Sequence, residues 1–255
     1  MSDPNGRFAW YELLTTDLPA ARAFYSQVVG WKAAASETPD MDYWIFSAGE
    51  APVAGAMTLQ AARQAGAPPH WLGYVLVKDV DAIASRAWTA GGKVCMAPVD
   101  IAGVGRFAVV ADPHGAAIGL WKPANSDQDE PPALEQPGRV GWHELYAGDL
   151  AAAFRFYAEL FGWEKKEAMD MGPLGVYQLF GTADCTLGGM MTKPPEDPVA
   201  QWNYYFNVGN IDEAAERVRG RGGQVRHGPQ EVPGGAYVVN GLDPQGAGFS
   251  LLGSR

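Results

Sequence analysis

The chain has 255 residues, of which 47% are hydrophobic and 19% are charged, a composition typical of a globular protein with one or two domains. Its formal net charge of −10, without a cluster of Lys and Arg, argues against a nucleic-acid partner, because phosphate binding depends on clustered cations. No stretch approaches the ~20 apolar residues of a membrane helix, and no apolar leader follows Met1. The two cysteines, Cys95 and Cys185, do not form a disulfide framework, so we expect a cytoplasmic protein.

The sequence contains a duplication. Residues Gly6–Trp31 and Gly138–Trp163 match at 13 of 26 positions without a gap, at a constant offset of 132. Shorter matches follow at nearly the same spacing, and the last are the turns D-P-H-G and D-P-Q-G. Between the copies lies a stretch rich in Pro and acidic residues, which is typical of an extended linker. The predicted organisation is a first module over residues 1–122, a linker over 123–137 and a second module over 138–255.

In chain order, each copy begins with a strand and a helix. The sequence predicts a strand over Phe8–Leu14, and Asp17 stands where an N-cap begins the following helix. Apolar residues of that helix recur at helical spacing, and Gly30 is placed to end it. The segment from Asp149 to Gly162 repeats this pattern in the second copy.

Short strands and a second helix complete each copy. Two strands are expected over Tyr43–Ser47 and Val53–Leu59. The pattern then restarts with a strand over His70–Val77, an N-cap at Asp79, a helix over Val80–Ala90 and strands near Val94, Phe107 and Ile118. Asn210 begins the matching helix of the second copy, so the chain is predicted to contain four βαβββ units.

Two motifs carry a resemblance to a known superfamily. The pattern D-L-x-x-A-x-x-F-Y at Asp17–Tyr25 and Asp149–Tyr157, each followed by Gly-Trp, and the D-P-x-G turns resemble the vicinal oxygen chelate superfamily. This superfamily includes glyoxalases, bleomycin-resistance proteins and dioxygenases, and the segment from Asp100 is similar to its tandem two-module glyoxalase-like branch. The resemblance implies an α+β fold of two tandem glyoxalase-like modules, each a pair of βαβββ units forming a curved mixed sheet around a cleft. It does not fix a reaction, because one fold hosts many chemistries.

The resemblance also implies where metal ligands would lie. Such metal enzymes use His and Glu in an octahedral site with two open positions. Counted from the N-caps and the D-P-x-G turns, the ligand positions fall on Trp10, Leu72 and Gly119 in the first copy and on Trp142, Asn203 and Ser250 in the second. None of these is an ordinary ligand, and exchange of halves between the copies does not restore the set. We therefore expect neither a metal nor another cofactor.

Acidic and aromatic residues are predicted to line the clefts instead. Glu12 and Glu144 share a strand face with Trp10 and Trp142, since side chains alternate along a strand. Each carboxylate would bind a substrate hydroxyl or act as a base with a raised pKa, or else be satisfied structurally by backbone or an Arg. His70 would transfer a proton opposite Glu12, or simply begin its strand near solvent. The candidate ligand-binding residues are Trp10, Trp142, Leu72, Tyr74, Asn203, Tyr205 and Arg106.

Each ligand-binding candidate also has a purely structural interpretation. The tryptophans could stack on a flat ligand or fill the core, and Arg106 could clamp a ligand carboxylate or lie on the surface. Three functions follow. The first is a metal-independent protein that binds a small organic molecule, acting as a monomer or homodimer. The second is an enzyme of the superfamily, a lyase, isomerase or oxygenase, that uses Glu12 or Glu144 as a base or has a non-standard metal site. The third is a scaffold whose clefts have decayed.

Overall fold

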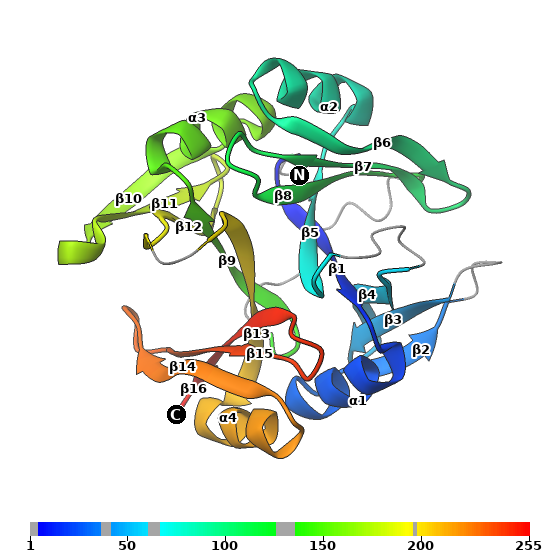
Figure 1. The fold of residues 1–255 in the computed structure, drawn as a ribbon, viewed down its shortest axis with the longest axis vertical. Coiled ribbons are helices and arrows are strands. Elements are labelled where there is room, and N and C mark those ends of the chain that lie inside the picture. The colour runs from blue at the N-terminus through cyan, green and yellow to red at the C-terminus, as the bar shows by residue number, and fades with distance from the viewer. Residues whose placement is uncertain (1–4, 37–41, 61–66, 126–135, 196–197) are drawn as a thin grey trace. The chain divides into compact units, whose positions relative to one another are not determined.

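The structure, a computed structural model, describes residues 5–36, 42–60, 67–125, 136–195 and 198–255. Within these residues it contains four α-helices and two eight-stranded mixed sheets, the α+β arrangement of two tandem glyoxalase-like modules (Figure 1). The strand order is β2-β3-β4-β1-β5-β8-β7-β6 in the first sheet and β10-β11-β12-β9-β13-β16-β15-β14 in the second. The two orders are equivalent, so the repeat in the sequence is also a repeat of topology.

The elements of the first copy are β1 (Phe8–Thr15), α1 (Leu18–Val28), β2 (Lys32–Ala35), β3 (Tyr43–Ala48), β4 (Ala51–Thr58), β5 (His70–Leu76), α2 (Val80–Thr89), β6 (Lys93–Ile101), β7 (Gly105–Ala111) and β8 (Ala117–Pro123). Those of the second copy are β9 (Val140–Ala147), α3 (Leu150–Phe161), β10 (Glu164–Asp170), the 3-10 helix η2 (Gly172–Leu174), β11 (Val176–Gly181), β12 (Thr186–Thr192), β13 (Gln201–Asn210), α4 (Ile211–Gly220), β14 (Gln224–Glu231), β15 (Tyr237–Leu242) and β16 (Gly248–Ser254).

The four predicted N-caps begin the four helices. In each case the side-chain oxygen accepts a hydrogen bond from the backbone N–H three residues later, at 2.7–3.0 Å. The capping residues are Asp17, Asp79, Asp149 and Asn210. Gly162 ends α3 in the left-handed conformation, with φ +70°, which favours glycine because it has no Cβ.

Strand β2, like its counterpart β10 in the second copy, is an element that the sequence pattern leaves unplaced. Its four residues read K-A-A-A and alternate in neither charge nor size. The strand lies at the edge of its sheet and pairs only with β3, so three of its four side chains are exposed. An edge strand of this kind buries too little apolar surface to leave a period-2 pattern.

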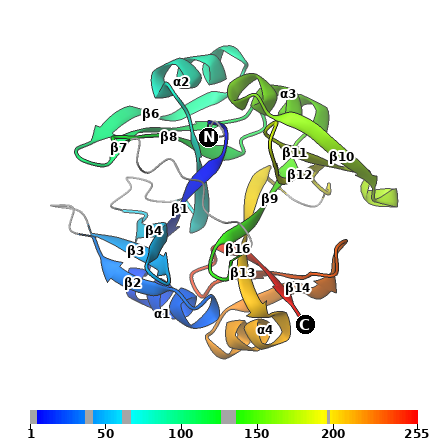
Figure 2. The same ribbon diagram turned by 180° about the vertical axis from the view of Figure 1, so that it is seen from behind.

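The chain divides into two compact units, and each combines parts of both copies. Unit 1 comprises residues 1–9, 73–132 and 143–202, and unit 2 comprises residues 10–72, 133–142 and 203–255. In unit 1, helix α2 packs against α3, and in unit 2, helix α1 packs against α4 (Figure 2). The core of each unit therefore draws its side chains from the first and the second copy.

A buried hydrogen-bond relay joins the two copies within unit 2. Trp71 Nε1 donates to Tyr25 Oη at 2.8 Å, and Tyr25 Oη donates to Asp243 Oδ2 at 3.1 Å. Tyr25 belongs to the helix motif of the first copy, whereas Asp243 begins the D-P-x-G turn of the second. Burial is the main cause that raises the pKa of Asp243. The two motifs therefore hold each other in place.

The same relay recurs within unit 1 with the copies exchanged. Trp202 Nε1 donates to Tyr157 Oη at 3.0 Å, and Tyr157 Oη donates to Asp112 Oδ2 at 3.3 Å. The tryptophans that follow the first helix of each copy make matching bonds, Trp31 Nε1 to the Gly138 carbonyl (2.7 Å) and Trp163 Nε1 to the Gly6 carbonyl (2.6 Å). Every motif on which the family resemblance rests thus makes a buried contact between copies.

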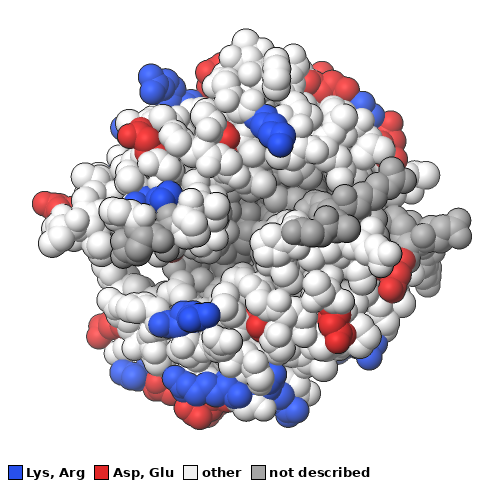
Figure 3. All heavy atoms as spheres, viewed as in Figure 1, with Lys and Arg blue, Asp and Glu red and all other residues white. Residues whose placement is uncertain are grey.

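Charged side chains are scattered over the surface. On the face seen in Figure 3, Lys and Arg are interspersed with Asp and Glu, and no large basic patch is seen there. The longest helix, α3, has 12 residues. None of the helices in the described part of the chain has the length and apolar character required to cross a membrane.

Candidate functional site

The helices cover one face of the strands and leave the other face to the candidate site residues. On β1, Tyr11 packs on the buried ring of Tyr204, at 5.4 Å between centroids, toward the helical core of unit 2. Because side chains alternate along a strand, Trp10 and Glu12 point to the opposite side. We call this side, away from the helices, the helix-free face of a strand.

A tyrosine holds the carboxylate of Glu12 on the helix-free face in unit 2. Tyr43, on β3, makes a hydrogen bond to Glu12, and Trp10 Nε1 donates to the Tyr43 oxygen at 3.0 Å. The ring of Tyr43 crosses Gly55 on the intervening strand β4, where a Cβ would lie 1.8 Å from the tyrosine oxygen. Burial, and then the negative charge of Glu12, raise the pKa of Tyr43 well above its usual value, so its hydroxyl stays protonated and donates.

Unit 1 contains the equivalent arrangement from the second copy. Tyr177 on β11 donates from its hydroxyl to Glu144 Oε1 at 2.9 Å, and its ring crosses Gly189 on β12. Gly189 pairs directly with Glu144 in the parallel register, as Gly55 pairs with Glu12. Glu144 is only 7% exposed. Each unit therefore contains one Glu–Tyr pair, and the tyrosine ring of each pair lies over a glycine.

In the first sheet, strands β5, β7 and β8 carry mainly apolar side chains on the helix-free face. Tyr74 on β5 lies over Gly119 on β8, where a Cβ would meet the tyrosine ring at 2.2 Å, and its ring is 6.3 Å from that of Phe107. Val109 pairs with Gly119 from the other side. Leu72, on the same face of β5 as Tyr74, is 2% exposed.

The matching half of the second sheet carries a polar cluster instead. Asn240 on β15 donates from Nδ2 to Ser250 Oγ at 2.8 Å and to Tyr205 Oη at 3.3 Å. Tyr205 pairs with Ser250 in the same register in which Tyr74 pairs with Gly119. Asn203, two residues before Tyr205 and on the same strand face, is half-buried. The two copies therefore differ in polarity at equivalent positions.

The donor set does not fit the metal site that the family resemblance implies. Indole, aliphatic and glycine positions supply no ligand atom, and Asn203 and Ser250 supply neutral oxygen or nitrogen in place of His and Glu. At position 119, the space that a ligand side chain would fill is occupied by the ring of Tyr74. Across the described residues, no group of three or more His, Cys, Asp and Glu side chains is placed to hold a metal ion.

Histidines contribute little to the helix-free faces. His70 begins β5, half-buried, and its Nδ1 contacts the Pro68 carbonyl at 2.9 Å. His143 lies on the helix-packing side of β9, fully buried, where it stacks on Phe8 at 4.0 Å and donates from Nδ1 to the Leu187 carbonyl at 2.6 Å. Desolvation lowers the pKa of His143 to about 4. Its neutral ring is therefore part of a core.

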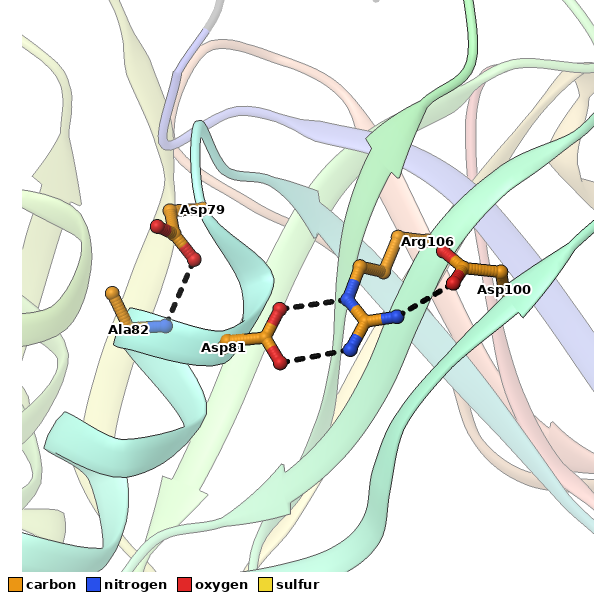
Figure 4. Close-up of polar contacts among 5 residues, drawn as sticks. All are labelled: Asp79, Asp81, Ala82, Asp100 and Arg106. Carbon is orange, nitrogen blue, oxygen red and sulfur yellow. Dashed lines mark hydrogen bonds and ion pairs between the residues drawn. The ribbon is translucent and has the colours of Figure 1, made fainter.

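Arg106 lies on the opposite side of β7 from Phe107 and forms a surface ion pair. Its guanidinium binds both carboxylate oxygens of Asp81 on α2, at 2.7 and 2.8 Å, and a carboxylate oxygen of Asp100 at 2.8 Å (Figure 4). The hydrogen bond from Arg106 lowers the pKa of Asp81. The structure thus places Arg106 against the helix and not beside Tyr74, and this guanidinium is already engaged by two carboxylates.

A different arginine restores this ion pair in the second copy. The counterpart of Asp81 is Asp212, which binds Arg255 through both carboxylate oxygens at 2.7 and 3.1 Å. Arg255 lies over the ring of Tyr237, the residue that replaces Arg106, at 4.7 Å from the ring centroid. Preservation of the pair by another residue indicates a structural role for both arginines.

Two surface grooves occur in unit 2, and neither contains a predicted site residue. One, of about 460 Å³, runs along α4 and is lined by Asp212, Glu213, Ala215, Glu216, Arg217, Arg219 and Pro229. The other, of about 770 Å³, runs along α1 and is lined by Ala20, Arg22, Ala23, Phe24, Ser26, Gln27, Trp31, Lys32, Ala33, Arg221 and Pro244. Both grooves are open to solvent, whereas clefts that bind small molecules bury most of the ligand surface.

Sequence reasoning singled out Glu12 and Glu144 but missed their partners. These partners, Tyr43 and Tyr177, come from other strands, and only the strand register brings them to the glutamates; the same holds for Asn240, the partner of Ser250 and Tyr205. One signal was available: Gly55 and Gly189 recur in both copies within apolar strands, and a strand glycine often marks a close approach by a neighbouring group.

Comparison with known proteins identifies relatives over nearly the whole chain. The chain is 32% identical over 245 residues to "Putative glyoxylase CFP32" of Mycobacterium bovis, with 95% of this chain and 93% of that protein covered. It is 33% identical over 264 residues to "Anthracycline biosynthesis protein DauV" of Streptomyces sp. (strain C5), with 98% and 94% covered.

Solved structures share the fold at low sequence identity. The 2,3-dioxygenase LapB from Pseudomonas sp. KL28 matches with a TM-score of 0.65 and 13% identity, over 97% of this chain and 92% of that one. The Mn(II)-bound glyoxalase from Novosphingobium aromaticivorans matches with a TM-score of 0.64 and 16% identity, over 98% and 82%. The sequence model of one family matches both copies, at residues 7–120 and 139–251. The chain therefore belongs to the Glyoxalase/Bleomycin resistance protein/Dioxygenase superfamily.

Proposed function

We propose that the chain binds a small, flat organic molecule on the helix-free faces of its sheets, without the metal ion of the metal-dependent family members. The observation that carries this proposal is the pair of Glu–Tyr contacts, Tyr43 with Glu12 and Tyr177 with Glu144. Both lie on strand faces where the positions of the family's metal ligands hold residues other than His and Glu. A carboxylate oriented in this way can accept a hydrogen bond from a ligand hydroxyl.

The aromatic residues support a flat ligand. Trp10 and Trp142 are both half-buried, so part of each indole remains exposed on a helix-free face, where an aromatic ring could stack. A relative carries the name of an anthracycline biosynthesis protein, and anthracyclines are flat, hydroxylated aromatic compounds. Residues Leu72, Tyr74, Asn203 and Tyr205 are assigned to ligand contact in this proposal, and His70 to proton transfer.

The test uses doxorubicin, a fluorescent anthracycline, titrated into the metal-analysed protein. We expect saturable binding, no change after chelator treatment, and less than about one transition metal per ten chains by elemental analysis. Loss of about one hydrogen bond to a carboxylate corresponds to roughly a tenfold loss of affinity. Glu12→Gln or Glu144→Gln should show this loss, whereas Glu50→Gln, at an exposed hairpin, should not. Stoichiometric metal, or equal behaviour of all three variants, would contradict the proposal.

The two units are expected to bind unequally. Each contains one Glu–Tyr pair, but they differ in polarity, because Val109 lies in unit 1 and Asn240 takes the equivalent position in unit 2. A single ligand should therefore prefer one unit, and only one of the two Glu→Gln substitutions should weaken binding strongly. Equal, small effects would assign both carboxylates a structural role.

A second candidate is an enzyme of the same superfamily, a lyase, isomerase or oxygenase. The geometry at Glu144 favours it, because this buried carboxylate is held in one orientation by the Tyr177 hydroxyl, as a general base must be. In that case Glu144→Gln would abolish turnover while leaving binding measurable. For either function, we propose that the protein acts in the cytoplasm as a monomer or homodimer and does not bind nucleic acid, in keeping with its net charge of −10.

A further inference from the structure

We infer that Asn240 is a specificity-determining residue, which gives the second copy a neutral hydrogen-bond acceptor for a ligand hydroxyl at the place where the family's last-strand metal ligand is missing. This inference rests on the proposed function and adds to it the chemical group that one copy recognises. Asn240, Ser250 and Tyr205 all lie within unit 2, on the helix-free face.

The face is established by the neighbours of these residues in sequence. Phe206 and Phe249, each one residue away from a cluster member, pack on Tyr25 of α1 at 6.2 and 5.9 Å between centroids. Val239, before Asn240, is fully buried. Because side chains alternate, Tyr205, Asn240 and Ser250 project to the side away from the helices.

The Asn240 amide nitrogen faces the two hydroxyls of the cluster. Ser250 Oγ at 2.8 Å and Tyr205 Oη at 3.3 Å both accept from Asn240 Nδ2. An amide nitrogen has two donor hydrogens, so two acceptors use its donor capacity and direct Oδ1 away from them. Among the described residues, both hydrogen bonds of the Asn240 side chain go through Nδ2, and Asn240 is half-buried while Ser250 and Tyr205 are buried. The carbonyl oxygen of Asn240 is therefore the hydrogen-bond acceptor that the cluster offers to a ligand hydroxyl.

The chemistry of the cluster selects an uncharged donor. No member carries a formal charge, so the cluster offers no ion pair to an anion or a cation, whereas an amide oxygen accepts well from a hydroxyl. The first copy has no such acceptor: Val109 occupies the register position of Asn240, and Gly119 that of Ser250. The first copy thus shows which apolar residues the fold accepts at the positions of Asn240 and Ser250.

The experiment compares two flat probes with the same ring system, 2,6-dihydroxyanthraquinone, whose hydroxyls lie too far from the quinone carbonyls to bond to them, and anthraquinone, by quenching of tryptophan fluorescence. Wild-type protein should bind the hydroxylated probe roughly threefold to tenfold more tightly, the range expected for one net hydrogen bond. Asn240→Val introduces the residue of the first copy and should remove this preference. Ser250→Gly, also a first-copy residue, frees the amide to turn and should reduce it.

Controls separate the inference from the proposed function. Val238→Ala changes the same strand without removing a hydrogen-bonding side chain and should keep the preference, and thermal unfolding confirms that each variant is folded. If both probes bind wild type and Asn240→Val equally well, the inference is overturned while the proposed function stands. If neither probe binds the folded wild type, both are overturned. If Asn240→Val is partly unfolded, Ser250→Gly takes its place. An unchanged preference of Ser250→Gly for the hydroxylated probe would then overturn the inference.

Discussion

The buried imidazole of His143 couples stability to pH. Its pKa is about 4 in the folded chain, because burial disfavours the charged ring, against about 6.5 in an unfolded chain. Between these values the unfolded state binds more protons, so the free energy of unfolding should fall as pH decreases from about 6.5 to about 4, by roughly 3 kcal/mol in total. Chemical denaturation at several pH values measures this loss.

The variant that tests this coupling is His143→Phe, which keeps the stacking on Phe8 and removes the titrating group. The loss of unfolding free energy between pH 6.5 and 4 should be smaller in this variant by about that amount. At neutral pH the substitution itself should cost about 1 kcal/mol, because the hydrogen bond to the Leu187 carbonyl is lost. The control is His114→Gln, an exposed position where the second copy has Gln245. An unchanged acid profile in His143→Phe would refute the assignment.

The relay hydroxyl of Tyr25 is the second residue whose removal has a predictable cost. Tyr25→Phe would leave the Trp71 indole without its acceptor and take a donor from Asp243, both in the core of unit 2. We expect a loss of about 2 kcal/mol in the free energy of unfolding, because buried polar groups lose partners. Tyr237→Phe removes an exposed hydroxyl contact to Glu231 and should cost less than about 0.5 kcal/mol. Equal losses would contradict a buried role for the relay.

Single residues also mark the limit of what the sequence could predict about the site. The shared faces of Glu12 with Trp10 and of Glu144 with Trp142 follow from alternation along one strand. The partners Tyr43 and Asn240 could not be predicted, because register between strands far apart in sequence decides them. Local periodicity contains no information on that register.

At the scale of elements, a glycine in β12 determines how β11 can lie. The ring of Tyr177 crosses Gly189, and a Cβ there would meet ring atoms at 2.2 Å. Gly189→Ala should therefore displace Tyr177, weaken its bond to Glu144 and cost about 1–3 kcal/mol in unfolding free energy. The control is Gly209→Ala in β13, where a Cβ meets nothing within 4 Å. Similar stability of the two variants would show that the ring yields easily.

Helices and their ends were predictable, but the edge strands β2 and β10 were not. All four N-caps were predicted, because an Asp or Asn before an apolar stripe has a specific local meaning. Strand β2 lacks such a signal, since it is an edge strand of K-A-A-A that exposes most of its side chains. Elements that bury a face leave a pattern in the sequence, and elements held only by backbone hydrogen bonds do not.

For the whole molecule, the mixed origin of the two units predicts how a cut chain behaves. Each unit contains segments of both copies, joined by buried contacts such as Trp31 with Gly138 and Trp163 with Gly6. A protease site introduced between residues 123 and 137 should yield two fragments that still elute together at the volume of the uncut protein, and separate only in denaturant. Fragments that separate under native conditions would contradict shared cores.

The sequence predicted the duplication and the fold class at this scale, but not the pairing of the halves. The motifs F-Y, Gly-Trp and D-P-x-G are visible in each copy, and nothing in them says that Tyr25 bonds to Asp243 across copies and not to Asp112 of its own copy. The two aspartates lie in turns of nearly the same sequence, so local chemistry is identical for both choices.

These shared cores constrain how the gene can change over time. A copy is the unit of inheritance, since it arose by duplication, yet it is not the unit of folding. Recombination that replaced one whole copy by that of a homologue would renew half of each core and leave the other half unmatched. The two copies are thus free to drift apart on their helix-free faces, as Val109 and Asn240 have done, while their interior residues must co-evolve.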